Sequence, residues 1–94
     1  MSTSIKETEK KIHLLENILD CLLKNGRVTM QEIRKNTIYQ FGSREISWTL
    51  KRLRKIGLVT YEGRVWYINK NVLKGLGLLA SQEILNYVLK KGLA

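Results

Sequence analysis

The sequence contains no proline, one histidine and one cysteine, and each scarcity excludes a class of protein or site. The lone Cys21 cannot form a disulfide within the chain, which favours an intracellular protein. No Pro-rich linker, internal repeat or low-complexity stretch divides the 94 residues, so we expect one domain covering residues 1–94. A domain of this size buries only about 60–65% of its unfolded surface, so a partner subunit would add useful burial.

Long hydrophobic runs are also missing. Lys, Gly or Asn interrupts the longest apolar stretches every few positions, which argues against a segment that spans a bilayer. The first twenty residues contain acidic side chains and no apolar run, which argues against a secretory signal. With 44% hydrophobic and 27% charged residues, the composition is that of a globular protein. We therefore expect a cytoplasmic protein that makes no contact with a membrane.

Groups that carry catalysis or bind metals are scarce as well. His13 and Cys21 are the only residues of their types and lie eight positions apart, so one chain cannot assemble a zinc site. Gly75 and Gly77 lack the preceding strand and the following Lys or Ser/Thr of a phosphate-binding loop. No pair of carboxylates is placed to share a cleft. The sequence thus predicts no enzyme, no metal and no cofactor.

Basic residues are what the sequence has in excess. The net charge is +9, and residues 24–74 hold twelve of the seventeen Lys and Arg but only three of the eight acidic residues. The two flanking segments together are neutral, so the whole excess belongs to the middle of the chain. A polyanion is the natural partner of such a segment, whereas a surface that serves only solubility normally mixes both signs.

Hydrophobic periodicity and turn residues predict a mainly helical α+β chain with one small β-hairpin. Capping-box spacings begin the first two helices, at Ser4 with Glu7 and at Thr29 with Glu32, and Ser43 is expected to cap the third. The expected elements are a helix over 4–25, a short helix over 30–36, a helix over 43–56, a hairpin over 58–68 with its turn at 62–63, and a helix over 72–91. Gly75 and Gly77 are expected to break or bend the first part of the last helix.

The third of these helices has an apolar side and a basic side. Ile46, Leu50 and Leu53 share one face at helical spacing, which should hold the helix to the core. The opposite face suits the major groove of DNA, where Arg pairs with guanine edges and Lys with phosphates. The alternatives are a solvated basic helix, and a Trp48 ring that packs on the connector or on a second subunit. The expected contacts to double-stranded DNA come from Tyr39, Ser43, Arg44, Ser47, Trp48, Lys51, Arg52 and Lys55.

The segment SREISWTLKRLRKIGLV, residues 43–59, resembles the recognition helix of winged helix-turn-helix regulators of the MarR, PadR and ArsR type. In those proteins a capped helix ends in Gly-Leu-Val or Gly-Leu-Ile and leads directly into the wing. Residues 61–64 and 66–68 match the wing tip and its return strand, and the resemblance covers roughly residues 14–68. It implies a winged helix-turn-helix with an extra C-terminal helix, and a wing contact from Arg64 to the minor groove or the flanking backbone. It also implies that bases or phosphates are contacted by Arg44, Ser47, Trp48, Lys51 and Arg52.

Two apolar surfaces exceed what a three-helix core needs, and they predict a homodimer. The apolar arc of the first helix spans nearly half of its circumference, and residues 72–91 add a second stripe. In PadR-like proteins the terminal helices pair two subunits, which brings two recognition helices into major grooves about 34 Å apart. The alternative is that the last helix covers the first helix of its own chain. The expected pairing residues are Leu14, Ile18, Cys21, Leu78, Leu85, Val88 and Leu89.

Three functions fit these expectations. The first is sequence-specific binding of double-stranded DNA by a dimeric transcription regulator. The second is DNA coating or partition, in which dimers assemble side by side along DNA. The third is a winged helix that binds another protein, with its charge incidental. Because no separate ligand domain is recognisable, we do not expect the protein to sense an effector.

Overall fold

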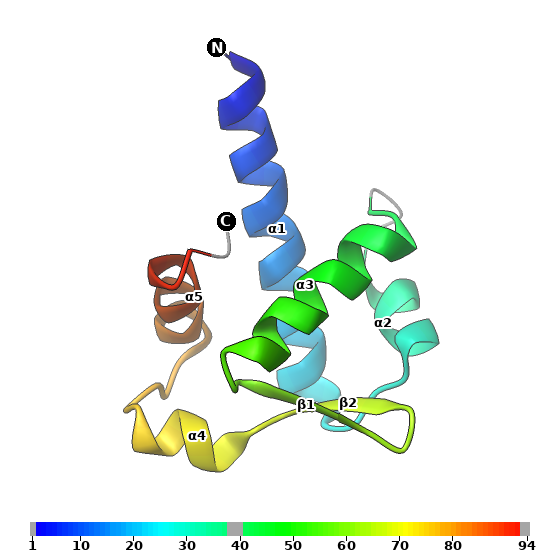
Figure 1. Cartoon of the computed structure of the whole chain (residues 1–94), viewed down its shortest axis with the longest axis vertical. Helices are drawn as coiled ribbons and strands as arrows, with labels where there is room; N and C mark the ends of the chain where they lie inside the picture. The colour runs from blue at the N-terminus through cyan, green and yellow to red at the C-terminus, as the bar shows by residue number, and fades with distance from the viewer. Residues whose placement is uncertain (1, 38–40, 93–94) are drawn as a thin grey trace.

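A long first helix, α1 (Ser2–Asn25), lies at the centre of the fold and packs against α2, α3, α5 and strand β2 (Figure 1). The computed structural model describes residues 2–37 and 41–92, with the side chains of residues 9–37 and 41–92. The expected class, mainly helical with one small antiparallel hairpin, is confirmed. The remaining elements are α2 (Met30–Asn36), α3 (Ser43–Lys55), β1 (Val59–Glu62), β2 (Val65–Ile68), α4 (Lys70–Gly75) and α5 (Ser81–Lys90).

The wide apolar arc of α1 is covered by other elements of the same chain. Helices α2 and α5 lie on opposite sides of α1, and α3 crosses it (Figure 1). Side chains on both sides of the arc are therefore buried, including Leu14 and Cys21 at one edge and Leu19 towards α5. An arc of this width follows from the number of elements that pack on the helix, because each neighbour covers its own stripe.

Helices α2 and α3 begin with different caps. Thr29 caps α2 as predicted: its side chain accepts a hydrogen bond from the Glu32 amide at 3.2 Å, and its amide donates to the Glu32 carboxylate at 3.1 Å. The N-cap of α3 is Gly42, so the predicted cap at Ser43 is wrong by one residue. Glu45 compensates for the missing side chain, since its carboxylate accepts from the Gly42 amide at 3.4 Å.

The apolar face predicted for α3 is confirmed, because Ile46, Leu50 and Leu53 are all buried. This burial fixes the rotation of the helix about its own axis. The basic positions of α3 are thereby held on the side away from the core.

The hairpin pairs Val59 with Ile68 and Glu62 with Val65. Its two-residue turn is Gly63–Arg64, one position later than predicted, and both residues have positive φ, at 61° and 64°. Two left-handed residues in succession define a type I′ turn, whose twist matches that of the paired strands. The hairpin is also joined to the link between α1 and α2, where Val28 and Trp66 exchange two backbone hydrogen bonds of 2.9 and 2.7 Å.

The helix predicted over residues 72–91 is two helices, α4 and α5. Gly77 adopts φ 72°, a left-handed conformation that no α-helix contains, and it ends the first of them. Ala80 is extended, and the Glu83 carboxylate accepts hydrogen bonds from the amides of Leu79 and Ala80 at 3.1 and 2.9 Å. The second helix therefore starts at Ser81, and its N-cap residue, Ala80, has no side chain that can accept a hydrogen bond.

The residues expected to pair two subunits are used inside the chain. Helix α5 packs against α1 of the same molecule, so the last helix covers the first helix of its own chain. Because these side chains lie in or against the core, they do not form the exposed pairing surface that the sequence suggested. Buried are Leu14, Ile18, Cys21, Leu85 and Val88, and partly buried against them are Leu78 and Leu89.

Candidate nucleic-acid interface

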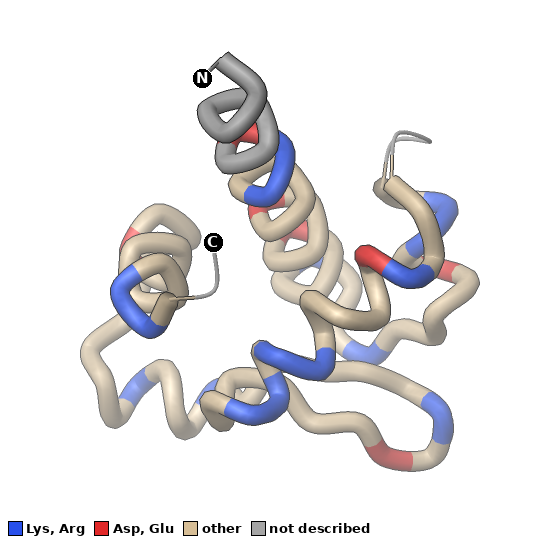
Figure 2. The backbone as a smooth tube through the Cα atoms, turned by 45° about the horizontal axis from the view of Figure 1, so that its top comes forward, with Lys and Arg blue, Asp and Glu red and all other residues tan. Residues whose placement is uncertain are grey.

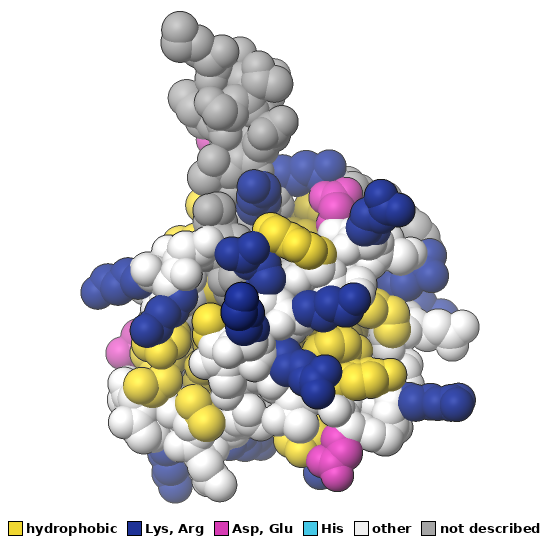
Figure 3. All heavy atoms as spheres, viewed as in Figure 1, with side chains coloured by type: hydrophobic (Ala, Val, Ile, Leu, Met, Phe, Trp, Pro, Cys, Tyr) yellow, Lys and Arg dark blue, Asp and Glu magenta, His cyan; other side chains and the backbone are white. Residues whose placement is uncertain are grey.

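The solvent side of α3 is basic. Arg44, Lys51 and Lys55 are exposed along it, and Ser43 is exposed in its first turn. Figure 2 shows basic positions along α3. Figure 3 shows Lys and Arg side chains spread over this face of the molecule, with acidic side chains near its margins. The structure thus brings together on one helix the cations that the sequence selected for contact with DNA.

One further cation of α3, Arg54, was missed by the sequence reasoning. It is exposed, and it lies seven residues after Ser47 and three after Lys51, which places it on the flank next to both. Its signal was present in the basic segment of residues 51–55 at the end of the helix, in which Leu53 is the only uncharged residue. Ser47 itself is half-buried, so it has less reach than the neighbouring cations.

Trp48 lies at the edge of the basic face rather than at its centre. Its side chain is 49% exposed, and the Arg52 guanidinium stacks over its ring at 4.5 Å from the centroid. On the side towards α1 it lines an apolar hollow of about 280 Å³ together with Leu14 and Arg44. Trp48, which the sequence selected for contact with DNA, is thus half exposed, and it lines hollows shared with α1 and with the end of α5.

The cations of this face have few acidic neighbours. In the part of the chain whose side chains are described, one ion pair forms, between Lys10 of α1 and Glu45 of α3 at 3.7 Å. Glu45 is the only acidic residue of α3, and its contacts are with Lys10 and with the Gly42 amide. The exposed Arg44, Lys51 and Lys55 consequently keep their charge available for an external anion.

The tip of the hairpin adds another cation. Arg64 is exposed at the turn, with a backbone conformation that arginine seldom adopts. The strands behind it are stiffened by side-chain contacts: the Tyr61 and Trp66 rings lie 4.5 Å apart, and the Tyr67 hydroxyl donates to Glu62 at 3.2 Å. The hairpin therefore holds Arg64 on a defined, projecting support.

The connector before α3 is described only in part. Tyr39, one of the residues expected to contact DNA, lies outside the described residues. Phe41 packs against the core and lines a surface hollow with Arg34 and Lys35, two exposed cations of α2 that the sequence reasoning did not select. Their position in the last turn of the helix preceding the connector was the available signal.

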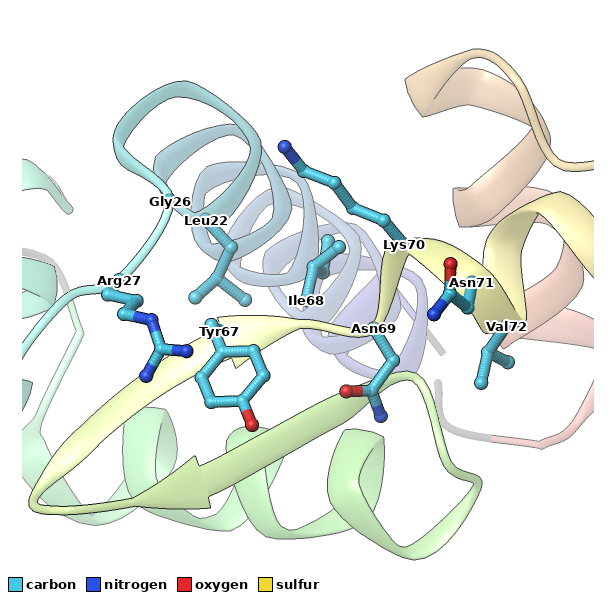
Figure 4. Close-up of a pocket in the computed structure, with 9 residues that line it drawn as sticks. All are labelled: Leu22, Gly26, Arg27, Tyr67, Ile68, Asn69, Lys70, Asn71 and Val72. Atoms are coloured by element: carbon cyan, nitrogen blue, oxygen red, sulfur yellow. The ribbon is translucent and has the colours of Figure 1, made fainter.

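A larger hollow, of about 630 Å³, lies among the end of α1, strand β2 and the start of α4 (Figure 4). Arg27 stacks over the Tyr67 ring at 4.4 Å. Asn69 donates to the Gly57 carbonyl at 2.8 Å and accepts from the Thr60 hydroxyl at 2.6 Å. The polar groups of Asn69 thus bind neighbouring strands and loops, which gives this hollow a structural role.

The acidic side chains, His13 and Cys21 are scattered among the described residues. No three His, Cys, Asp or Glu residues among them gather into a group able to hold a metal ion. Burial raises the pKa of the Cys21 thiol, against a smaller lowering by its hydrogen bond from Asn25, so at neutral pH the thiol stays protonated. No helix within the described ranges has the length and apolarity to cross a membrane.

No family model matches the chain, and no curated protein or solved structure matches it either. The resemblance to winged helix regulators therefore rests on residues 14–68 of this sequence alone. A proposal for the function therefore has to be based on the charge and geometry of α3 and the hairpin.

Proposed function

We propose that this chain is a winged helix-turn-helix protein that binds double-stranded DNA, with α3 in the major groove and the hairpin as the wing. The succession of α2, connector and α3 supports this, as does the bridge of Val28 to the second hairpin strand. Thirteen residues of α3 span about 20 Å at 1.5 Å per residue. That length and the girth of one helix suit a groove about 12 Å wide.

The observation that carries the proposal is the set of exposed cations on α3, free of acidic partners within the described residues. Arg44 near the start of the helix suits bidentate contact with a guanine edge, and Lys51 and Lys55 suit phosphates. Arg64 on the wing suits the electronegative minor groove or the adjacent backbone. A basic helix that is merely solvated would have no need of a strained arginine at the hairpin tip.

A charge-matched pair of double variants tests the proposal. Arg44→Ala with Lys51→Ala removes two cations from the solvent side of α3, and Lys24→Ala with Lys74→Ala removes two exposed cations from α1 and α4. Fluorescence anisotropy with a labelled duplex should show at least a tenfold loss of affinity in the first variant, since each good contact contributes about 1–3 kcal/mol. The second should bind nearly as the wild type does. Equal losses in both would mean that net charge alone attracts DNA, and lack of any duplex binding by the wild type would refute the proposal.

We propose that the protein binds DNA as a transcription regulator. Selection of bound duplexes from a random library, followed by footprinting, separates it from DNA coating. A regulator gives one bounded footprint on the selected site, whereas a partition or coating protein gives protection that extends along the flanking DNA as protein is added. The protein-binding alternative predicts no duplex binding at all.

Pairing of two copies belongs to the proposal, because a two-fold site offers half-sites about one helical turn apart. Since the side chains named from the sequence are used within the chain, a dimer has to use others. Val72, Leu76 and Leu79 are large apolar side chains left exposed around α4 and the turn that follows it. Sedimentation velocity of the wild type and of Leu76→Ser with Leu79→Ser should show a dimer that the double variant loses; a wild-type monomer at all concentrations would refute pairing.

A further inference from the structure

A hollow of about 600 Å³ lies beside Trp48, where the end of α5 approaches α3. Four of its six lining residues are cations, and they come from two segments about forty positions apart in the sequence, which the fold alone brings together. No carboxylate is among the lining residues in the described part of the chain. The lining residues are Trp48, Lys51, Arg52, Lys55, Ile56 and Lys91.

Arg52 is held in place at this hollow, with donors to spare. Its guanidinium stacks on Trp48 at 4.5 Å and donates one hydrogen bond, of 3.4 Å, to the Gly92 carbonyl. Its Nε is buried without an acceptor among the described residues. An arginine carries five N–H donors, and a buried donor left unpaired is unfavourable. A strong acceptor entering the hollow beside Gly92 would therefore be met by a preoriented guanidinium.

Lys91, at the end of α5, also lines the hollow beside α3. It follows directly after α5, and its ammonium lies 5.4 Å from the centroid of the Tyr87 ring. This contact is with a ring of α5, and Lys91 lines the same hollow as the cations of α3. Lys90, its exposed neighbour in the sequence, does not line the hollow.

We propose that this hollow holds a phosphate group of the DNA backbone beside the groove that α3 enters, so that α5 makes a second contact with DNA. The inference rests on the proposed function. A strand that borders an occupied major groove runs along the flank of the helix, and contacts to its phosphates fix the orientation of the protein. Arg52 offers planar donors, Lys91 offers a point charge from the end of α5, and the Trp48 ring adds apolar surface to the lining.

Adjacent lysines provide the test. Lys91→Ala should weaken binding of a labelled duplex about three- to tenfold at 150 mM salt and reduce the slope of log affinity against log salt by about 0.9. Lys90→Ala removes the same charge from the same end of α5 and should change neither quantity. Circular dichroism of both variants checks that the fold is retained.

The outcomes distinguish this inference from the function on which it rests. If Lys91→Ala behaves like Lys90→Ala while Arg44→Ala with Lys51→Ala abolishes binding, the DNA proposal stands and the phosphate contact at α5 is wrong. If the wild type binds no duplex, both are wrong. A free polyphosphate has the same chemistry, so tripolyphosphate is titrated by calorimetry. One-to-one binding that Lys91→Ala removes, with DNA affinity unchanged, would assign the hollow to a small polyanion and overturn the inference.

Discussion

Arg64 is held in a conformation that opposes its own preferences. A left-handed backbone costs a residue with a Cβ about 1–2 kcal/mol, and position 64 is the only non-glycine position with positive φ among the described residues. Glycine or asparagine would satisfy a type I′ turn at lower cost. Strain of this kind points to a functional side chain, and here the side chain is a projecting cation.

Replacement of this arginine should separate stability from binding. Arg64→Gly should raise the free energy of unfolding by up to about 1 kcal/mol, measured by urea denaturation, because glycine relieves the left-handed strain. The same variant should bind duplex DNA more weakly if Arg64 makes the proposed wing contact.

Arg64→Lys is the matched control. It keeps both the charge and the strain, so its unfolding free energy should equal that of the wild type and most of the affinity should remain. An Arg64→Gly variant with unchanged affinity would remove the hairpin tip from the interface.

Among the elements, α5 covers part of the apolar surface of α1. Because α5 packs on α1 of its own chain, its buried residues stabilise the monomer. Leu85→Ala should lower the unfolding free energy by about 2–5 kcal/mol, as expected for a truncated core leucine. Lys90→Ala, at an exposed side chain of the same helix, should change it by less than about 0.5 kcal/mol.

Protein concentration distinguishes this packing from an exchange of α5 between two chains. Leu76→Ser with Leu79→Ser removes the proposed pairing surface, so in that background the melting temperature, with or without Leu85→Ala, should not depend on concentration if α5 covers its own α1. A melting temperature that rises with concentration, and rises less in Leu85→Ala, would show that α5 stabilises an oligomer.

The start of α5 depends on one carboxylate. Glu83→Ala should lower the unfolding free energy by about 1 kcal/mol, because the amides of Leu79 and Ala80 lose their acceptor. Gln82→Ala is the neighbouring control: its side chain bonds only Asn86 on the helix surface, at 3.2 Å, so a change below about 0.5 kcal/mol is expected in thermal or urea unfolding. Equal losses in the two variants would show that Glu83 has no special capping role.

The elements that the sequence predicted well are those with local signals. The α2 cap at Thr29 and the buried face of α3 follow from spacing alone, and both are confirmed. A break or bend at Gly75 and Gly77 was expected, and Gly77 does separate α4 from α5. The start of α5 was not predicted, because its cap comes from Glu83, the third residue of the helix. The use of Leu85 and Val88 was misassigned because sequence periodicity identifies an apolar face without identifying its partner.

The exposure of the candidate site was predictable in the same measure. Cations on the face opposite Ile46 follow from helical geometry, and Arg44, Lys51 and Lys55 are exposed as expected. The approach of Lys91 to α3 depends on the path of α4, Gly77 and α5 through space, which no local pattern encodes.

The basic face belongs to the molecule as a whole, since it joins α3, the hairpin tip and the end of α5. If five of its cations each neutralise one phosphate, the slope of log affinity against log salt should be about −4.5, and affinity should fall roughly 500-fold between 50 and 200 mM salt. Anisotropy titrations across that range measure the slope. Affinity that barely changes with salt would exclude a phosphate-contacting interface of this size. The five cations are Lys51, Arg52, Lys55, Arg64 and Lys91.

The two tryptophans divide the molecule between two optical signals. Trp66 is 5% exposed in the core behind the hairpin, and Trp48 is 49% exposed with a guanidinium on its ring. The emission of Trp66 therefore reports the loss of the fold, whereas the emission of Trp48 reports what reaches the surface of α3. Unlabelled protein thus carries separate spectroscopic probes of unfolding and of ligand arrival, and Trp48→Phe assigns each signal to its ring.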